Sequence, residues 1–316
     1  MMVIREKILA MFSVMLAMIL VTACSKSELT GSGGTARERV TVTVSFRDFA
    51  ATKAASDGDG AAANVNHWVV EVRDVKYPSK IFYREEKDAA AGTREQTFEL
   101  LLVKNQTYDI AFWADCKGCY GVSDLTSVQM LSPEGNKDTF DAFCTVKKNY
   151  QYMGDKITAT LTRPLSQLNF IATDMKELEA FVSAEAYPNY KPSDFELTVP
   201  VAVKYNVYAG AVLDSDITMR TFKASEIYGT YSPAADETTL FMSYVFADSN
   251  NTKDLEFKFK SNQADIGVNV TNVPVKTNCR TNIKGNFFTG KVQCSVTVCP
   301  DWNEPDFEVW VAGLPE

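Results

Sequence analysis

The chain has 316 residues, of which 46% are hydrophobic, and it carries a formal net charge of −8. That hydrophobic content is typical of a folded protein, and the length suits two domains of ordinary size. The acidic balance, with no run of basic residues, argues against nucleic-acid binding, which depends on clustered Lys and Arg side chains.

The beginning of the chain has the pattern of an export signal. Arg5 and Lys7 precede an apolar run from Ile8 to Val21 that only Ser13 interrupts. A membrane-spanning helix needs about 20 apolar residues, so this shorter run is typical of the hydrophobic region of a signal peptide. The run leads into Val21-Thr22-Ala23-Cys24, which resembles the lipobox of bacterial lipoproteins.

The lipobox resemblance implies cleavage between Ala23 and Cys24 and attachment of fatty acids to the Cys24 thiol. Two or more acyl chains, at about 0.8 kcal/mol per buried CH₂, make a stable membrane anchor. The alternative is an ordinary secretory signal with an incidental cysteine. Cleavage would leave 293 residues (316 − 23) with a charge of −9, because residues 1–23 carry two basic residues and one acidic residue.

The segment that follows is expected to be a flexible tether over residues 24–38. Ser25 to Ala36 is rich in Ser, Thr and Gly and has almost no apolar side chains, so it cannot bury enough surface to fold. The tether would hold the folded part away from a membrane surface.

A first strand is expected immediately after the tether. Val40, Val42, Val44 and Phe46 alternate with polar residues, a period of two that predicts a strand with one buried face. Ala50 to Ala63 breaks this pattern with small residues and Asp-Gly-Asp-Gly, which predicts a long exposed loop.

Short strands with turn residues between them dominate the rest of the chain. We also expect a hairpin loop at Lys87–Thr93, a short helix at Ser123–Leu131 and a helix at Met175–Ala184, the last because its apolar residues share one face. The expected strands are Trp68–Val75, Ile81–Arg84, Phe98–Val103, Tyr108–Ala114, Lys156–Thr162, Gln167–Ala172, Phe195–Val203, Lys204–Tyr208, Leu240–Phe246, Leu255–Phe259, Ile266–Val270, Asn286–Phe288, Lys291–Val298 and Phe307–Val311.

These elements predict a mainly β protein with two β-sandwich domains in series and one or two short helices. We place the boundary at Arg163-Pro164, which gives domains over residues 39–163 and 164–316. No internal repeat of 20 to 50 residues is apparent in the sequence.

Six cysteines remain besides Cys24, three in each half of the chain. An even number in an exported protein permits disulfides, but six cysteines allow fifteen pairings, and the sequence does not choose among them. Cys116-Lys117-Gly118-Cys119 has the spacing of redox and zinc sites. The segment after Cys119 does not favour the helix of a redox motif, and no second cysteine pair or histidine supports zinc, so we expect structural or free thiols and no bound metal or cofactor.

Catalytic signatures are missing from the sequence. His67 is the single histidine, and its place at the start of a strand predicts an exposed edge residue. There is no Gly-x-Ser-x-Gly elbow and no phosphate-binding glycine-rich loop. A pair of catalytic carboxylates cannot be recognised without geometry. We therefore expect a protein that is not an enzyme.

Several segments together resemble the fimbrillin superfamily of the Bacteroidota, whose members build type V pili or serve as their anchors and accessory subunits. The resemblance lies in the order of lipobox, tether, alternating strand and small-residue loop, followed by Trp68-Val69-Val70-Glu71-Val72. It continues near the end of the chain in Cys279 to Asn286, Thr289-Gly290, Val292 to Val296, Trp302 and Val309-Trp310-Val311. Tyr108 to Asp115 and Leu161 to Phe170 resemble a less characterised branch of gut lipoproteins related to fimbrillins.

The resemblance implies transthyretin-like β-sandwiches, an outer-membrane lipoprotein at the cell surface or in a fimbrium, and assembly by donor-strand exchange with other pilus subunits or with itself. In fimbrillins a protease removes the first strand, here Val40 to Phe46, and a strand from another subunit replaces it. The candidate donor strand in this chain carries Phe307, Val309 and Val311, although the same segment would equally serve as an ordinary last strand.

One position departs from the family pattern. The residue that matches the cleavage arginine is Lys53, and Arg47 is the nearest arginine after the first strand. The chain is therefore expected to be either a cleaved subunit or an uncut anchor or accessory subunit.

The alternative function is a surface glycan-binding lipoprotein. Aromatic side chains that stack on sugar rings could come from Trp113, Tyr120, Trp302 and Trp310, although aromatics in strands more often belong to the core.

Overall fold

The computed structural model describes residues 36–46, 62–132, 137–174, 195–213, 217–223, 231–232, 237–248, 251–260, 265–286, 294–300 and 307–310. The expected signal peptide, the start of the tether, residues 50–61 of the expected loop after the first strand and the helix over Met175–Ala184 lie outside these residues. In the described part of the chain, no helix has the length and apolar character needed to cross a membrane.

The described elements are strands and one short 3-10 helix, η1 (Asp138–Phe140). The strands are β1 (Arg37–Phe46), β2 (His67–Asp74), β3 (Ile81–Asp88), β4 (Glu95–Val103), β5 (Thr107–Asp115), β6 (Tyr120–Gly121), β7 (Val128–Met130), β8 (Phe143–Gln151), β9 (Ile157–Leu161), β10 (Leu165–Ala172), β11 (Phe195–Ala202), β12 (Lys204–Asn206), β13 (Ala211–Val212), β14 (Ile217–Lys223), β15 (Tyr231–Ser232), β16 (Glu237–Phe246), β17 (Asn251–Lys260), β18 (Asp265–Val275), β19 (Cys279–Gly285), β20 (Cys294–Pro300) and β21 (Phe307–Trp310).

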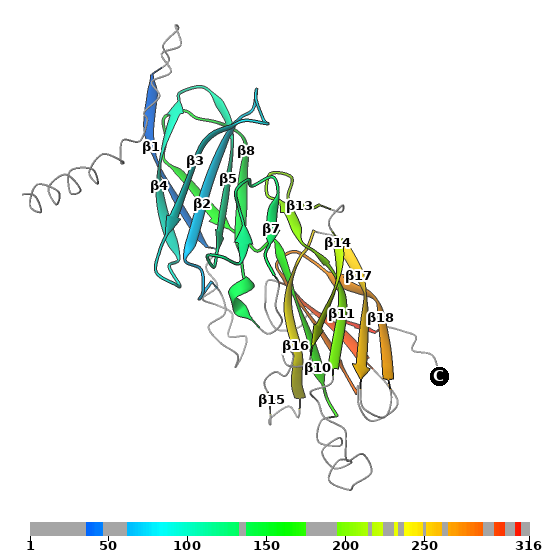
Figure 1. The fold of residues 1–316 in the computed structure, drawn as a ribbon. Coiled ribbons are helices and arrows are strands. Elements are labelled where there is room, and N and C mark those ends of the chain that lie inside the picture. The colour runs from blue at the N-terminus through cyan, green and yellow to red at the C-terminus, as the bar shows by residue number, and fades with distance from the viewer. Residues whose placement is uncertain are drawn as a thin grey trace, which may run out of the picture. The chain divides into compact units, whose positions relative to one another are not determined.

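Two sheets form a sandwich in the first half of the chain (Figure 1). One has the strand order β4-β1-β9 and the other has the order β3-β2-β5-β8. Apolar side chains from both sheets meet in one core, which includes Val42 of β1, Trp68 of β2, Leu100 of β4 and Phe112 of β5, all with no exposed surface. Burial of alternate residues on facing sheets is what stabilises a sandwich.

Strand β2 is covered on both faces. Trp68, Val70 and Val72 point into the core of the sandwich, whereas Val69 belongs to a second core. This second core includes residues of the small sheet β13-β12-β7-β6, to which both halves of the chain contribute strands. Every residue of β2 is therefore buried, including the charged Glu71.

The second half contains a six-stranded sheet, β15-β16-β10-β19-β20-β21, and a four-stranded sheet, β14-β11-β17-β18. Its first strand, β10, pairs antiparallel with β16 and parallel with β19. Strand β1 is flanked in the same way, antiparallel by β4 and parallel by β9. The two halves thus share an arrangement that is not visible as a sequence repeat.

The mainly β prediction is confirmed, and three local predictions are wrong. Ser123–Leu131 forms turns and β7 instead of a helix, because its apolar residues pair and pack against β12. Strand β3 continues to Asp88 into the expected loop. His67 is 6% exposed instead of lying open at an edge, because β3 and β5 flank β2 on both sides.

The fold leaves three structural expectations untested. The described residues contain no α-helix, so the expectation of one or two short helices stays a prediction. The transthyretin-like assignment and the domain boundary at Arg163-Pro164 also stay predictions. Residues 37–316 form one compact unit.

Candidate functional site

Strand β1 occupies a slot between β4 and β9 (Figure 1). It pairs antiparallel with β4 over nine residues, Arg37 to Ser45, and parallel with β9 over five residues, Val42 to Phe46. Because backbone hydrogen bonds hold both of its edges, removing β1 would leave two facing strand edges without a partner.

The inner face of β1 fits into the sandwich core. Val40, Val42, Val44 and Phe46 are at most 8% exposed, and the residues between them lie on the outer face. The alternation places four apolar side chains at the two-residue spacing of a strand. An occupant of this slot must present the same pattern.

Phe46 fills the most distinctive part of the slot. Its ring centroid lies 4.9 Å from that of Trp68 and 4.5 Å from that of Phe143. Trp68 and Phe143 have no exposed surface, so the ring of Phe46 separates them from solvent. We call the space lined by Trp68 and Phe143 the Phe46 pocket, and its shape favours an aromatic side chain.

Polar contacts line the rim of the slot. On the outer face, the Thr41 hydroxyl donates a hydrogen bond to Glu99 Oε1 at 2.9 Å. The Arg37 guanidinium lies 5.0 Å above the ring of Phe82, and the Tyr152 hydroxyl donates to a Glu38 carboxylate oxygen at 3.3 Å. Contacts of this kind near the surface contribute little to stability.

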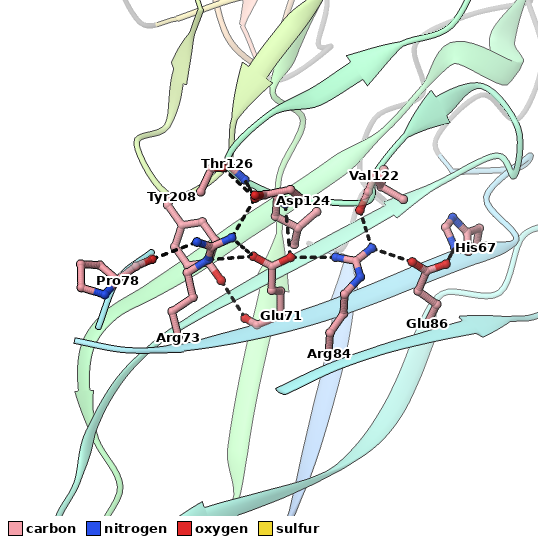
Figure 2. Close-up of polar contacts among 11 residues, drawn as sticks. His67, Glu71, Arg73, Pro78, Arg84, Glu86, Val122, Asp124, Thr126 and Tyr208 are labelled. Atoms are coloured by element: carbon pink, nitrogen blue, oxygen red, sulfur yellow. Dashed lines mark hydrogen bonds and ion pairs between the residues drawn. The ribbon is translucent and has the colours of Figure 1, made fainter. Parts of the chain in front are cut away.

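A second constellation is a row of charges on the other face of β2 (Figure 2). Glu71, which has no exposed surface, accepts from Arg73 Nε at 2.9 Å and from Arg84 Nη1 at 2.8 Å. Arg73 also donates to Asp124 at 2.8 Å, and Arg84 donates to Glu86 at 2.6 Å. Each buried charge therefore has a partner, as burial of charges requires.

Tyr208 from the second half of the chain and Leu125 from the loop before β7 cover this row of charges. The Tyr208 hydroxyl donates to the backbone carbonyl of Glu71 at 3.1 Å, and Arg73 lies 5.1 Å from the Tyr208 ring centroid. Leu125 N donates to the Glu71 carboxylate at 3.3 Å. Since all these contacts join elements of the fold, the row of charges serves as a polar junction between strands and loops.

His67 ends this row. Its Nδ1 lies 2.8 Å from Asp115 Oδ1, and its Nε2 lies 3.2 Å from Glu86 Oε2. The hydrogen bond to Asp115 raises the pKa of His67 above its usual 6.5, although burial opposes this. Each ring nitrogen thus faces a carboxylate, and the raised pKa favours the charged imidazolium, in which both nitrogens donate.

The pKa values of the two carboxylates around His67 are shifted in opposite directions. Burial raises the pKa of Asp115, and the hydrogen bonds from His67 and Trp113 offset only part of this effect. Burial also works to raise the pKa of Glu86, but hydrogen bonds from Arg84 and His67 leave it below its usual value. Asp115 is the buried partner that fixes the ring of His67.

The structure places only some of the predicted site residues. The four apolar residues of the first strand lie in the slot, and Phe307 and Val309 lie in β21, which pairs with β20 at the end of the six-stranded sheet. Cleavage and lipidation at Ala23 and Cys24, the candidate cleavage residues Arg47 and Lys53, and the donor residue Val311 lie outside the described residues.

Two of the four candidate aromatics are in the core. Trp113 has no exposed surface, and Tyr120 is 4% exposed. Trp302 lies outside the described residues, and Trp310 ends β21. Cys116 and Cys119 flank the turn between β5 and β6, and among the described residues no group of three or more His, Cys, Asp or Glu side chains is arranged to hold a metal.

A family model described as "Family of unknown function (DUF6562)" matches residues 32–312. None of the curated proteins matches the sequence.

Several solved structures from the Bacteroidota are similar to this chain. A candidate polysaccharide binding protein (DUF1812) from Bacteroides thetaiotaomicron is 12% identical, with a TM-score of 0.50, and the match covers 87% of this chain and 98% of that one. This likeness shows a shared fold.

Two fimbrial proteins of Porphyromonas gingivalis are also similar. The anchor protein Mfa2 is 10% identical with a TM-score of 0.49, and the match covers 83% of this chain and 97% of that one. The tip protein Mfa3, in a C-terminally truncated form, is 10% identical with a TM-score of 0.48, and the match covers 83% of this chain and all of that one.

Proposed function

The chain belongs to the DUF6562 family, and we propose that it is a cell-surface adhesion protein of the fimbrial type whose first strand can be exchanged for a strand of another subunit. The position of β1 carries this proposal. The strand lies between two partners, its inner face is apolar, and it is the first described element of the chain. A cut after Phe46 would separate it from β2 without breaking any other strand that the structure describes.

The energetics favour replacement of β1 once it is lost. Burying one Val or Phe side chain is worth about 1.5 to 3 kcal/mol, so the four inner side chains contribute about 6 to 12 kcal/mol. Loss of the strand would also expose the backbone edges of β4 and β9. A strand from another subunit would bury the apolar face again and restore the backbone hydrogen bonds to β4 and β9, and its alternate side chains would supply specificity.

The C-terminal segment is the proposed donor. In Val42-x-Val44-x-Phe46 the aromatic residue comes last, whereas in Phe307-x-Val309-x-Val311 it comes first. The donor would therefore bring Phe307 to the Phe46 pocket by running opposite to β1, antiparallel to β9. In the chain itself β21 pairs only with β20 among the described strands, so its release breaks a single ladder.

Anchoring at the outer membrane is part of the proposal. The motif before Cys24 supports lipidation, and the Ser- and Gly-rich segment supports a tether between lipid and β1. Cleavage of the first strand would also detach the lipid anchor, because Cys24 and β1 lie on the same side of the cut. An uncut chain would remain an anchor subunit.

A surface glycan-binding lipoprotein is the alternative function. It draws support from the likeness to the candidate polysaccharide binding protein of Bacteroides thetaiotaomicron. Against it, Trp113 and Tyr120 are buried, so their rings are not available to stack on a sugar. Binding to a glycan array that is lost on truncating an exposed aromatic such as Tyr77, which is 63% exposed, would favour this alternative.

The proposal is tested by replacing β1 with a peptide. A site for a specific protease is inserted between Phe46 and Ala62, the protein is cleaved, and a labelled peptide with the sequence Arg37–Phe46 is added. The cleaved protein is expected to take up the peptide, and the uncut protein is not. A control peptide with Phe46→Ala is expected to bind more weakly, because it leaves the Phe46 pocket empty.

The peptide experiment also has a result that contradicts the proposal. If the cleaved protein unfolds, or stays folded and rejects the peptide, then β1 is a permanent part of the core and strand exchange is wrong.

A further inference from the structure

The turn between β5 and β6 brings two cysteines together. Cys119 N donates to the Cys116 carbonyl at 3.0 Å, which closes a four-residue β-turn. Gly118 in the middle has φ of +91°, a left-handed conformation that glycine adopts without strain. The ends of a β-turn lie less than about 7 Å apart between Cα atoms, and disulfides usually span about 4.4 to 6.8 Å.

Neighbouring groups hold this turn in place. Lys117 N donates to Asn66 Oδ1 at 2.8 Å, and the Lys117 side chain forms an ion pair with Asp88. The Cys119 carbonyl accepts from Leu131 N at 2.8 Å. The two cysteines are thus held at the two ends of one β-turn.

The two thiols also contact each other and are open to reagents. The Cys116 and Cys119 side chains are hydrogen-bonded, and both residues are partly exposed. Burial and the neighbouring Cys116 thiol raise the pKa of the Cys119 thiol to about 11. Cys144 is different, since it is buried and burial alone raises its pKa to about 12.

We propose that Cys116 and Cys119 are a disulfide site that closes the turn after β5 when the protein is exported. The oxidant is a disulfide-bearing exchange partner. One cysteine thiolate attacks a sulfur of that disulfide, which breaks its S–S bond, releases one partner thiolate and forms a mixed disulfide. The second cysteine thiolate then attacks the sulfur of the first cysteine, which breaks the mixed disulfide and releases the second partner thiolate. Two cysteine thiols become one disulfide and lose two protons and two electrons, and the partner disulfide becomes two thiols. The proposal relies on the export that forms part of the proposed function, but not on strand exchange.

Lys117 makes the site directly measurable, because trypsin cuts between the two cysteines. The resulting fragments, residues 105–117 and 118–137, each contain one cysteine, and Cys144 falls in a later fragment. Protein isolated from the cell envelope is alkylated, digested without reductant and analysed by mass spectrometry. The two fragments are expected to remain linked, to separate on reduction, and to stay separate in Cys116→Ser protein. Cys144→Ala is the matched control and should leave them linked.

A second arm separates the disulfide from export. The isolated full chain is reduced and then equilibrated with oxidised and reduced glutathione, which requires neither export nor strand exchange. If the fragments are linked in this glutathione experiment but the thiols are alkylated in the cell sample, the result would contradict export and still support the geometry of the disulfide site. Glutathione attached separately to Cys116 and Cys119, with no linked fragments, would overturn the proposal.

Discussion

Replacing Phe46 by Ala removes the side chain that closes the slot of β1. Phe46 is 8% exposed and its ring lies between Trp68 and Phe143, with centroid distances of 4.9 and 4.5 Å. Phe→Ala substitutions in a core cost about 3 to 5 kcal/mol, of which aromatic pairing accounts for about 0.5 to 1.5 kcal/mol per pair. We expect the free energy of unfolding to fall by about 3 to 5 kcal/mol.

The assay is equilibrium unfolding in urea, followed by tryptophan fluorescence. Leu101→Ala is the matched control, because Leu101 lies on the neighbouring strand β4 with 41% of its surface exposed. The control should change the unfolding free energy by no more than about 0.5 kcal/mol. A cost below about 1 kcal/mol for Phe46→Ala would mean that Phe46 does not seal the pocket, and the argument for specificity of strand replacement would fail.

Three further predictions concern other parts of the chain. Arg163 donates two hydrogen bonds to buried Asp141, at 2.7 and 2.8 Å, so Asp141→Ala should lower stability by about 3 to 5 kcal/mol, measured by urea unfolding. The pKa of His67 is raised, so its stabilising effect should be complete below pH 6.5 and decline at higher pH. The stability difference between wild type and His67→Gln should shrink accordingly in melts across this range, and a difference that grows with pH would refute this. Cys24→Ala should abolish fatty-acid labelling in cells, and persistent labelling would exclude lipidation at this residue.

The sequence was sufficient to predict the elements with one buried face. In β1 the alternation of Val and Phe with polar residues matches the observed burial residue by residue. Other strands were also predicted, but β8, β14 and β19 were not among those expected, and a strand buried on both faces, such as β10, shows no period of two.

Prediction failed where contacts between distant segments determine the structure. All residues of β2 are buried. The only indication in the sequence that Glu71 and Arg73 are buried is that these two charged residues lie within an apolar run. Their partners Arg84, Asp124 and Tyr208 come from other elements, which a single sequence does not connect. His67 was misjudged for the same reason, since its burial depends on β3 and β5.

The most direct test of strand exchange is assembly of the protein after removal of β1. The chain with a specific protease site inserted between Phe46 and Ala62 is cleaved, and the products are examined on denaturing gels without boiling. We expect ladders of subunits that disappear when residues 306–316 are deleted and when excess peptide Arg37–Phe46 is added. Folded cleaved protein that stays monomeric, or ladders that persist without residues 306–316, would contradict assembly through the C-terminal strand.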